Sequence, residues 1–501
     1  MALECTSLYA VTNLSPHLTS FLVALAQQVR DRMSLAAGLP SENPTSPTWQ
    51  QPPAPIASVQ SPTLPAVTDI AIIGSGITGT SVAHTLLKHS KASELKVTIL
   101  EARGACSGAT GRNGGHLVSD TCGSFLRLVE QLGTEEAVKV FRFSEANITG
   151  LKAVVSQLSD AERDAVELRE VIATCVLTDT ETLEHSKSSL AAFQAAVKDS
   201  ILDHVLSEDQ DIIKNGLAVL DQKGAGALWP YRLITILQKR LLDSYANTFT
   251  LETNTPVNAI TYEASENGVE YMLQTPRGSI RAKKVIHCTN GYSSHLLPSL
   301  TGKLYPLRGT VTVQDPGVSF PNLGNLYSWT LLHKPGYDPE TRRLTTGLVY
   351  SQQNAKTGEI FIGGESQEIE NTLNSDDSKV SESAKQYLSA LVPKMYRDAE
   401  DAKTKNVWSG IMGFTSDGLP LVGNIGQTIT GREGSNEWIA AGFNGHGMDK
   451  CWLSGEAVAR MALGEEVPAW FPRSFLASEK RLESFTLDNS VHGLVSMFSA
   501  E

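Results

Sequence analysis

A short apolar run followed at once by a glycine-rich turn is the feature that most constrains the fold of this 501-residue chain. Residues Asp69–Ile73 have the composition of a buried β-strand, and Gly74, Gly76 and Gly79 follow in the pattern GxGxxG. In such a turn the first glycine permits the tight bend, and the second lets the backbone approach a diphosphate. The third lets a helix pack closely against the strand. The segment therefore predicts a diphosphate held at the N-terminus of a helix.

The next elements give the turn its structural context. A helical segment, Thr80–Lys88, and a second strand, Lys96–Leu100, complete a βαβ opening. Glu101 closes the second strand about twenty residues after the last glycine, where a carboxylate binds the ribose hydroxyls of a dinucleotide. A carboxylate at this position also disfavours a 2′-phosphate, which argues against NADP.

A second glycine-rich stretch, Arg103–His116, distinguishes between the two remaining candidates, NAD and FAD. Its five glycines, with Arg112 and Asn113 among them, let backbone amides and a cation approach a large anionic ligand. A nicotinamide cofactor does not need this second stretch, whereas a flavin whose ring lies far from its adenine does. We therefore expect FAD.

Composition excludes several classes of protein. The net charge of −12 argues against a nucleic-acid binder, and the 41% hydrophobic and 19% charged residues are typical of a soluble globular chain. The six cysteines are scattered, which predicts neither a disulfide framework nor a metal site and favours a reducing compartment. No apolar run reaches the roughly 18 residues that span a bilayer. We expect a cytoplasmic protein with a small-molecule substrate and no stable membrane association.

The N-terminal region differs from the rest. Residues 15–36 have helical periodicity, with Ser15 before Pro16 as the start. Residues 38–66 are rich in proline, serine and threonine and should run extended over the surface, with Trp49 docked on the main body. Later segments predict a helix at Leu233–Tyr245 and strands at Val269–Thr275, Lys284–Cys288, Thr310–Val313 and Glu359–Ile362.

The Gly74–Gly79 turn, Glu101 and the Ser107–His116 loop together resemble the D-amino-acid oxidase superfamily of FAD enzymes. Its amine branch includes glycine and sarcosine oxidases and γ-glutamylputrescine oxidase. The resemblance continues through later segments, so that it covers roughly residues 66–470: Gly224–Pro230 with Thr255–Val257, Val285–Tyr292, Trp408–Gly423 and Gly442–Met448.

The resemblance implies an α/β fold in which a Rossmann-type FAD-binding domain carries an inserted antiparallel β-sheet substrate domain, as in glutathione-reductase-like proteins. We expect an N-terminal extension (1–66), an FAD-binding domain (67–125, 217–300 and 406–470), a substrate domain (126–216 and 301–405) and a tail (471–501).

The turn motifs and the resemblance together predict the residues around the cofactor. They are Gly74, Ser75, Gly76, Ile77, Thr78, Gly79, Glu101, Ala102, Arg103, Ser107, Ala109, Thr110, Arg112, Asn113, Gly114, Gly115, His116, Val257, Thr289, Asn290, Gly291, Gly410, Gly445, His446, Gly447 and Met448. The helical run that begins at Lys450 would direct its positive end at the flavin ring, where reduction places negative charge.

The sequence departs from the family pattern at three places. Covalent members carry a cysteine near Gly410–Gly413, where this chain has none, so we expect non-covalent FAD, with His116 as an alternative attachment point. Amino-acid-specific members carry an arginine where Met412 and Gly413 stand. Arg308 could supply a cation to the pocket or could organise the crossing between domains.

The third departure is Asp449, which follows the Gly445–Met448 segment where sarcosine oxidases have a lysine. An acid near the flavin would favour a cationic amine. His446, Asp449 and Arg308 are therefore the candidate catalytic residues.

These features predict an enzyme that transfers hydride from a small amine to flavin N5, giving an imine and then a carbonyl product. Whether O₂ is the electron acceptor, giving H₂O₂, is left open. Two alternatives remain: FAD-dependent oxidation of an alcohol or ring carbon, and a non-catalytic protein-binding module, as Rab GDP-dissociation inhibitors resemble FAD enzymes.

Overall fold

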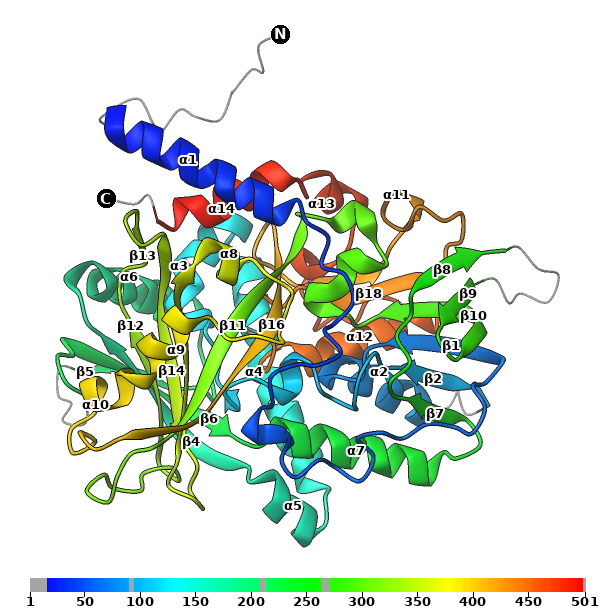
Figure 1. Ribbon diagram of the computed structural model, residues 1–501, viewed down its shortest axis with the longest axis horizontal. Helices are drawn as coiled ribbons and strands as arrows, with labels where there is room; N and C mark the ends of the chain where they lie inside the picture. The colour runs from blue at the N-terminus through cyan, green and yellow to red at the C-terminus, as the bar shows by residue number, and fades with distance from the viewer. Residues whose placement is uncertain (1–15, 90–93, 208–212, 264–270, 499–501) are drawn as a thin grey trace.

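The computed structural model describes residues 16–89, 94–207, 213–263 and 271–498 (Figure 1). Ser15 and Val269, at the start of a predicted helix and a predicted strand, lie outside these ranges. Helices and strands are organised around two β-sheets, which confirms the predicted α/β fold class.

Eight strands of the described chain form the first sheet, in the order β17-β18-β10-β1-β2-β7, with β9 and β8 attached through β10. The five adjacent strands from β18 to β7 run parallel. The strands are β1 (Val67–Ile73), β2 (Val97–Leu100), β7 (Phe249–Glu252), β8 (Ala259–Tyr262), β9 (Tyr271–Thr275), β10 (Gly278–His287), β17 (Leu421–Asn424) and β18 (Glu437–Ala441).

Both faces of the first sheet are covered, which explains why the last four residues of β1, Ile70–Ile73, are all apolar. Successive side chains of a strand point to opposite faces. Ile70 and Ile72 pack in the cluster that includes helix α2 (Ile77–Lys88), whereas Ala71 and Ile73 pack on the side of β8 and β9. Helices α7 (Pro230–Ser244) and α12 (Cys451–Ala462) join α2 on its face (Figure 1).

Ten strands of the described chain form the second sheet, in the order β16-β11-β15-β14-β12-β4-β6-β3, with β13 on β14 and β5 on β6. It is antiparallel except for the parallel pair β12 and β4. The strands are β3 (His116–Leu117), β4 (Arg169–Leu177), β5 (His204–Ser207), β6 (Ala218–Ala227), β11 (Leu304–Asp315), β12 (Tyr327–Leu332), β13 (Gly336–Asp338), β14 (Arg343–Gln353), β15 (Ile360–Glu368) and β16 (Lys403–Thr415).

The other helices are α1 (Pro16–Met33), α3 (Thr121–Leu132), α4 (Thr134–Ser156), α5 (Asp160–Val166), α6 (Thr180–Ala196), α8 (Ile369–Thr372), α9 (Glu382–Ser389), α10 (Leu391–Met395), α11 (Gln427–Thr430), α13 (Glu479–Glu483) and α14 (Leu487–Ser496). Most of them pack against the second sheet or lie near the ends of the described chain, whereas α5 packs on α7 and α11 connects β17 to β18.

The predicted elements are present, with shifted ends. Helix α2 begins at Ile77 rather than Thr80, and α7 begins at Pro230 rather than Leu233. A proline at the first helical position has no amide hydrogen to satisfy, so it starts the helix without cost. Strands β3, β6 and β16 pair within the second sheet.

The first and the last described helices, α1 and α14, meet on one side of the molecule. Leu25, Val29 and Met33 of α1 are buried together with Val491 and Leu494 of α14, and the two helices lie side by side in Figure 1. The segment after α1 first runs down between the two sheets and then passes α7 and β7 before it reaches β1.

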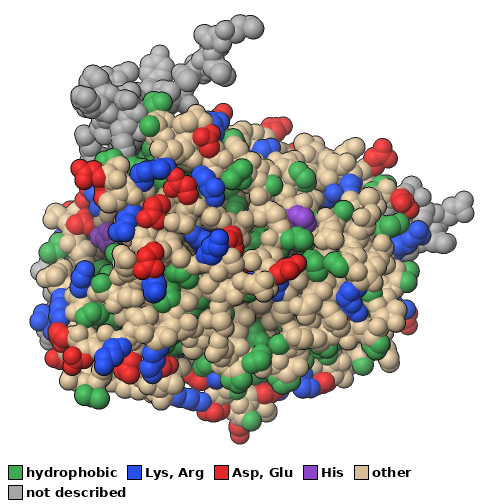
Figure 2. Space-filling model, in the orientation of Figure 1, with side chains coloured by type: hydrophobic (Ala, Val, Ile, Leu, Met, Phe, Trp, Pro, Cys, Tyr) green, Lys and Arg blue, Asp and Glu red, His purple; other side chains and the backbone are tan. Residues whose placement is uncertain are grey.

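On the face shown in Figure 2, acidic and basic side chains are interspersed and are most frequent on its left part and along its rim. Within the described ranges, none of the helices offers an apolar stretch that could span a lipid bilayer.

Candidate functional site

The turn after β1 has a geometry that only glycine permits at two positions. Gly74 has φ +108°, and a Cβ atom there would lie 2.5 Å from the carbonyl oxygen of Cys288. A Cβ atom on Gly79 would lie 2.0 Å from the carbonyl oxygen of Gly74. These close approaches set the start of α2 directly against the carboxyl ends of β1 and β10, as a diphosphate-binding helix end requires.

Glu101 links this turn to the second glycine-rich stretch. Its Oε2 atom accepts hydrogen bonds from the Ser75 amide at 3.0 Å and the Ser75 hydroxyl at 2.6 Å. Its Oε1 atom accepts from the Arg103 amide at 3.0 Å, and the Ser75 hydroxyl accepts from the Cys106 amide at 2.8 Å. One carboxylate therefore holds both turns at the edge of the same cavity.

Two arginines fix the second stretch from within. Arg103 donates to both carboxylate oxygens of Asp377, at 2.9 and 3.0 Å, and Arg112 donates to the carbonyl oxygens of Ser107 and Ser409, each at 2.8 Å. Burial lowers the pKa of Arg112 to about 10, so the group remains a cation at neutral pH. Both arginines line the cavity.

A cavity of about 1280 Å³ extends from this turn to the second sheet. Its volume exceeds the roughly 300–1,000 Å³ of ordinary small-molecule sites, which leaves room for a dinucleotide and a substrate together. The predicted residues that line it are Gly74, Ser75, Gly76, Ile77, Thr78, Glu101, Ala102, Arg103, Ala109, Thr110, Arg112, Asn113, Gly114, Gly115, His116, Val257, Thr289, Asn290, Gly410, Gly445, His446, Gly447, Met448 and Asp449.

Three other predicted cofactor residues lie behind the cavity wall. Gly79 and Gly291 are packing positions: a Cβ atom on Gly291 would lie 2.5 Å from the Met412 carbonyl oxygen. Ser107 presents its carbonyl oxygen to Arg112 and leaves a buried hydroxyl without a partner among the described residues.

Two cavity-lining side chains fit a large polar ligand. The Arg103 Nε and the His116 Nε2 atoms are buried and have no hydrogen-bond partner in the described part of the chain. Since buried polar atoms are normally paired, these two are available to a bound molecule. With the glycine turn and Glu101, they suit the diphosphate, ribose and ring of FAD.

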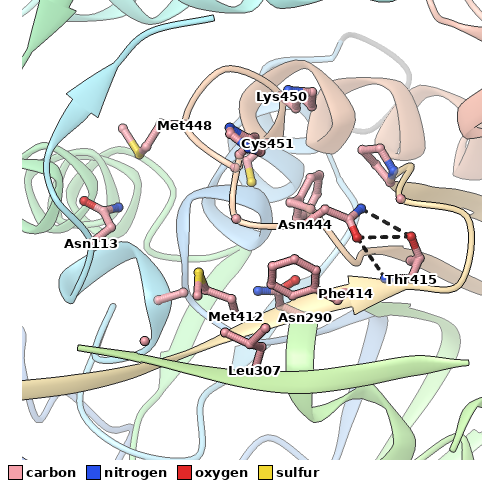
Figure 3. A pocket seen from close by; sticks show the side chains of 18 of the residues that line it. Asn113, Asn290, Leu307, Met412, Phe414, Thr415, Asn444, Met448, Lys450 and Cys451 are labelled. Atoms are coloured by element: carbon pink, nitrogen blue, oxygen red, sulfur yellow. Dashed lines mark hydrogen bonds between the residues drawn. The ribbon is translucent and has the colours of Figure 1, made fainter. Parts of the chain in front are cut away.

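The second sheet gives one of its faces to the same cavity. Alternate residues of β11 and β14 line it, among them Leu307, Gly309, Leu348 and Tyr350. Figure 3 shows Leu307 of β11 together with Met412 and Phe414 of β16 around this space, and the hydrogen bonds between Asn444 and Thr415 close one side.

Arg308 is held away from this space. Leu307 and Gly309, its neighbours on β11, line the cavity, and successive residues of a strand point to opposite faces. The guanidinium group donates to the Asp376 carbonyl oxygen at 3.0 Å and to Asn371 Oδ1 at 2.6 Å. Its contacts are those of a structural arginine.

His446 and Asp449 belong to a charged cluster at the start of α12 that includes two residues the motifs did not indicate. Lys450 Nζ lies 3.1 Å from Asp120 Oδ1 and 2.7 Å from Asp449 Oδ2. His446 Nε2 lies 3.4 Å from Asp120 Oδ2, and Asp449 Oδ2 accepts from the Ser144 hydroxyl at 2.6 Å.

The two acids of this cluster differ in environment. Burial raises the pKa of Asp449, whose side chain is 1% exposed. Burial also raises the pKa of Asp120, but the charges of His446 and Lys450 outweigh it and hold that pKa well below its usual range. The side chain of Asp120 is 29% exposed. Burial lowers the pKa of Lys450, but the two acids hold it above its ordinary value.

Asp120 and Lys450 could not be selected from the sequence. Asp120 follows β3 and Lys450 precedes α12, 330 positions later, and neither belongs to a glycine motif. The one signal in the sequence was that Lys450 directly follows Asp449. That signal did not indicate Asp120 as a partner of Lys450.

Comparison with known proteins agrees with this geometry. The model of the FAD dependent oxidoreductase family, DAO, matches residues 69–461. A protein described as probable oxidoreductase OrdL, from Rhizobium meliloti (strain 1021), is 23% identical over 437 residues, covering 83% of this chain and 91% of the relative.

Two solved structures share the fold. Glycine oxidase from Geobacillus kaustophilus superposes with a TM-score of 0.61 at 19% identity, over 83% of this chain and 99% of its own. L-proline dehydrogenase from P. horikoshii superposes with a TM-score of 0.60 at 19% identity, over 84% of this chain and 100% of its own.

Proposed function

Because this chain belongs to the DAO family of FAD-dependent oxidoreductases, we propose that it oxidises the carbon–nitrogen bond of a small amine. The observation that carries the proposal is the charged cluster of Asp120, Asp449 and Lys450 on the wall of a cavity that begins at the dinucleotide turn. Two similar structures are named for glycine and L-proline, which both contain such a bond.

Residues at several points of the cavity would hold the cofactor. The start of α2 would face the diphosphate, Glu101 the ribose and Val257 the adenine, while Gly445–Met448 would border the flavin ring. Bound FAD supplies the two-electron acceptor for the hydride that the α-carbon of the substrate loses. The resulting imine is hydrolysed by water to a carbonyl product.

We assign recognition of a positive charge on the substrate to Asp120 rather than to Asp449. Asp120 is the more exposed of the two acids, and its low pKa keeps it ionised at neutral pH. Asp449 is enclosed between Ser144 and Lys450, which suits a residue that positions the lysine. Arg308 is assigned a structural role because its guanidinium group faces Asp376 and Asn371.

We also propose that FAD is bound without a covalent bond. Burial raises the pKa of the Cys451 thiol to about 12, so this cavity-lining cysteine is protonated and a weak nucleophile. His116, the alternative attachment point, lines the cavity as a neutral imidazole because burial lowers its pKa to about 4. Acid precipitation should release the flavin into the supernatant; flavin that stays with the protein would identify a covalent link.

Anaerobic reduction of the bound flavin tests the main proposal. The purified yellow protein is mixed without oxygen with a panel of amines and amino acids and, separately, with alcohols and sugars. We expect amines to bleach the visible flavin absorbance. Bleaching by alcohols alone would instead support oxidation of a carbon–oxygen bond, and a protein that binds no FAD would support the non-catalytic module. Adding air to the reduced protein and measuring peroxide then decides whether O₂ is the acceptor.

A further inference from the structure

The segment between α1 and β1 lies outside the family match, which begins at residue 69, and yet it contacts the cofactor cavity. We call residues 37–61 of this segment the N-terminal strap. In Figure 1 its first part follows α1 and runs between the two sheets, and its later part runs beside α7 to β7. The family domain alone therefore does not form the whole wall of the cavity.

The first part of the strap lies at the end of the cavity that Glu101 and Val257 also line. Gly38, Leu39 and Pro40 are lining residues there. Hydrogen bonds fix the backbone directly before them: the Ala37 amide donates to the Ser294 hydroxyl at 3.0 Å, and the Ala37 carbonyl oxygen accepts from the Ser375 hydroxyl at 2.6 Å.

Arg103 connects this part of the strap to the glycine-rich stretch. Its guanidinium group donates to the Ser41 carbonyl oxygen at 3.2 Å while it pairs with Asp377. The amide of Arg103 donates to Glu101, the expected ribose ligand. Arg103 thus links the strap to the nucleotide end of the cavity.

The next part of the strap holds the glycine-rich stretch from its outer side. Gln50 Nε2 donates to the carbonyl oxygens of Ser107 and Gly111, at 3.2 and 3.1 Å. The Trp49 indole donates to the Asn113 carbonyl oxygen at 2.5 Å. Because residues 108–116 line the cavity almost without interruption, the stretch lies between the strap and the cavity.

Trp49 anchors the strap to the body of the protein. Its side chain is 2% exposed, stacks on Phe361 with ring centroids 4.0 Å apart and meets Trp229 edge-on at 5.0 Å. The Trp229 indole in turn donates to the Trp49 carbonyl oxygen at 2.7 Å. The position of Gln50 next to this anchor is therefore well defined.

We propose that residues 37–50 of the strap are a part of the FAD site contributed from outside the family domain. Gly38–Pro40 close the nucleotide end of the cavity, and Trp49 and Gln50 hold the glycine-rich stretch in the shape that binds the cofactor. The proposal rests on FAD binding, which family membership implies, and is independent of the amine substrate.

Release of FAD from the holoenzyme tests the proposal. Gln50→Ala removes both hydrogen bonds to the glycine-rich stretch, and we expect FAD to leave about ten times faster, equivalent to about 1.4 kcal/mol. Gln51→Ala is the matched control, because among the described residues the exposed Gln51 side chain donates only to Ser46, at 2.6 Å. The rise in free-flavin fluorescence after dilution measures the rate.

Trp49→Phe provides a second variant that keeps an aromatic ring against Phe361 but removes the donor to Asn113. It should also release FAD faster than the unchanged protein. Equal release rates for Gln50→Ala and Gln51→Ala, with Trp49→Phe at the rate of the unchanged protein, would overturn the proposal. A protein that binds no FAD would instead contradict the assignment of the cofactor.

Discussion

Glu101 shows how much one side chain can organise in this site. Its carboxylate accepts from Ser75 and from the Arg103 amide, so the two glycine-rich segments cannot separate without breaking its hydrogen bonds. A buried carboxylate whose donors are lost keeps its desolvation cost, which is why such a residue is strongly coupled to the fold around it. Cofactor binding and local folding therefore depend on the same acid.

Asp120→Asn should weaken binding of a charged amine. The substitution removes the accessible negative charge of the α12 cluster while it preserves the shape of the side chain. We expect the KM for a diamine to rise about ten-fold, or about 1.4 kcal/mol, with the flavin absorbance spectrum unchanged. Steady-state kinetics with a diamine and with a monoamine of equal length provide the comparison. Equal increases for both substrates would show that Asp120 does not recognise the second charge.

At the scale of the element, the position of α2 depends on how closely the helix approaches β1. The helix packs between α7 and α12 and begins directly after the turn, so its first residues have no freedom to move outward. The Ile77 amide is satisfied by the Thr110 hydroxyl at 3.0 Å, which ties the helix start to the second glycine-rich stretch as well.

Gly79→Ala should disrupt this arrangement, because the new Cβ atom would lie 2.0 Å from the Gly74 carbonyl oxygen. Overpacking of this kind typically costs about 1–3 kcal/mol, and here it displaces the turn, so both the unfolding temperature and the FAD content should fall. Gly123→Ala is the control: Gly123 is in the first turn of α3, with nothing within 4 Å of a Cβ atom. Thermal unfolding and flavin content of the two variants would be the same if the Gly79 contact were unimportant.

The whole molecule is sensitive to acid through histidines that are buried in their neutral form. Burial lowers the pKa of His84, His116 and His204 to about 4. In the unfolded chain a histidine titrates near pH 6.5. Between these two values the unfolded chain binds more protons than the folded one, so stability is complete above about pH 6.5 and is lost as the pH falls toward about 4.

Unfolding temperature measured at saturating FAD should therefore decrease through this pH window. His204→Gln should make the decrease shallower, since the side chain at this position would no longer titrate and could still accept from Gln222, which lies 2.9 Å from His204 Nε2. An identical pH dependence in the variant would show that His204 does not contribute.

The sequence by itself determined those parts of the structure that depend on residues close together along the chain. The Gly74–Gly79 turn, Glu101 and the βαβ opening follow from local steric rules, because only glycine permits those backbone approaches and a strand of β-prone residues must precede them. The family follows from the same segments in their order along the chain.

Tertiary structure alone decided which distant side chains meet. Arg308 points away from the cavity because β11 packs with Leu307 and Gly309 inward, and nothing in the strand's own residues selects that face. Asp120 and Lys450 are brought together across 330 positions, and Gln50 reaches the glycine-rich stretch only because Trp49 is buried beside it. Such contacts arise when the two sheets and the strap pack against one another. The packing energy is shared among many residues, so no single sequence motif predicts it.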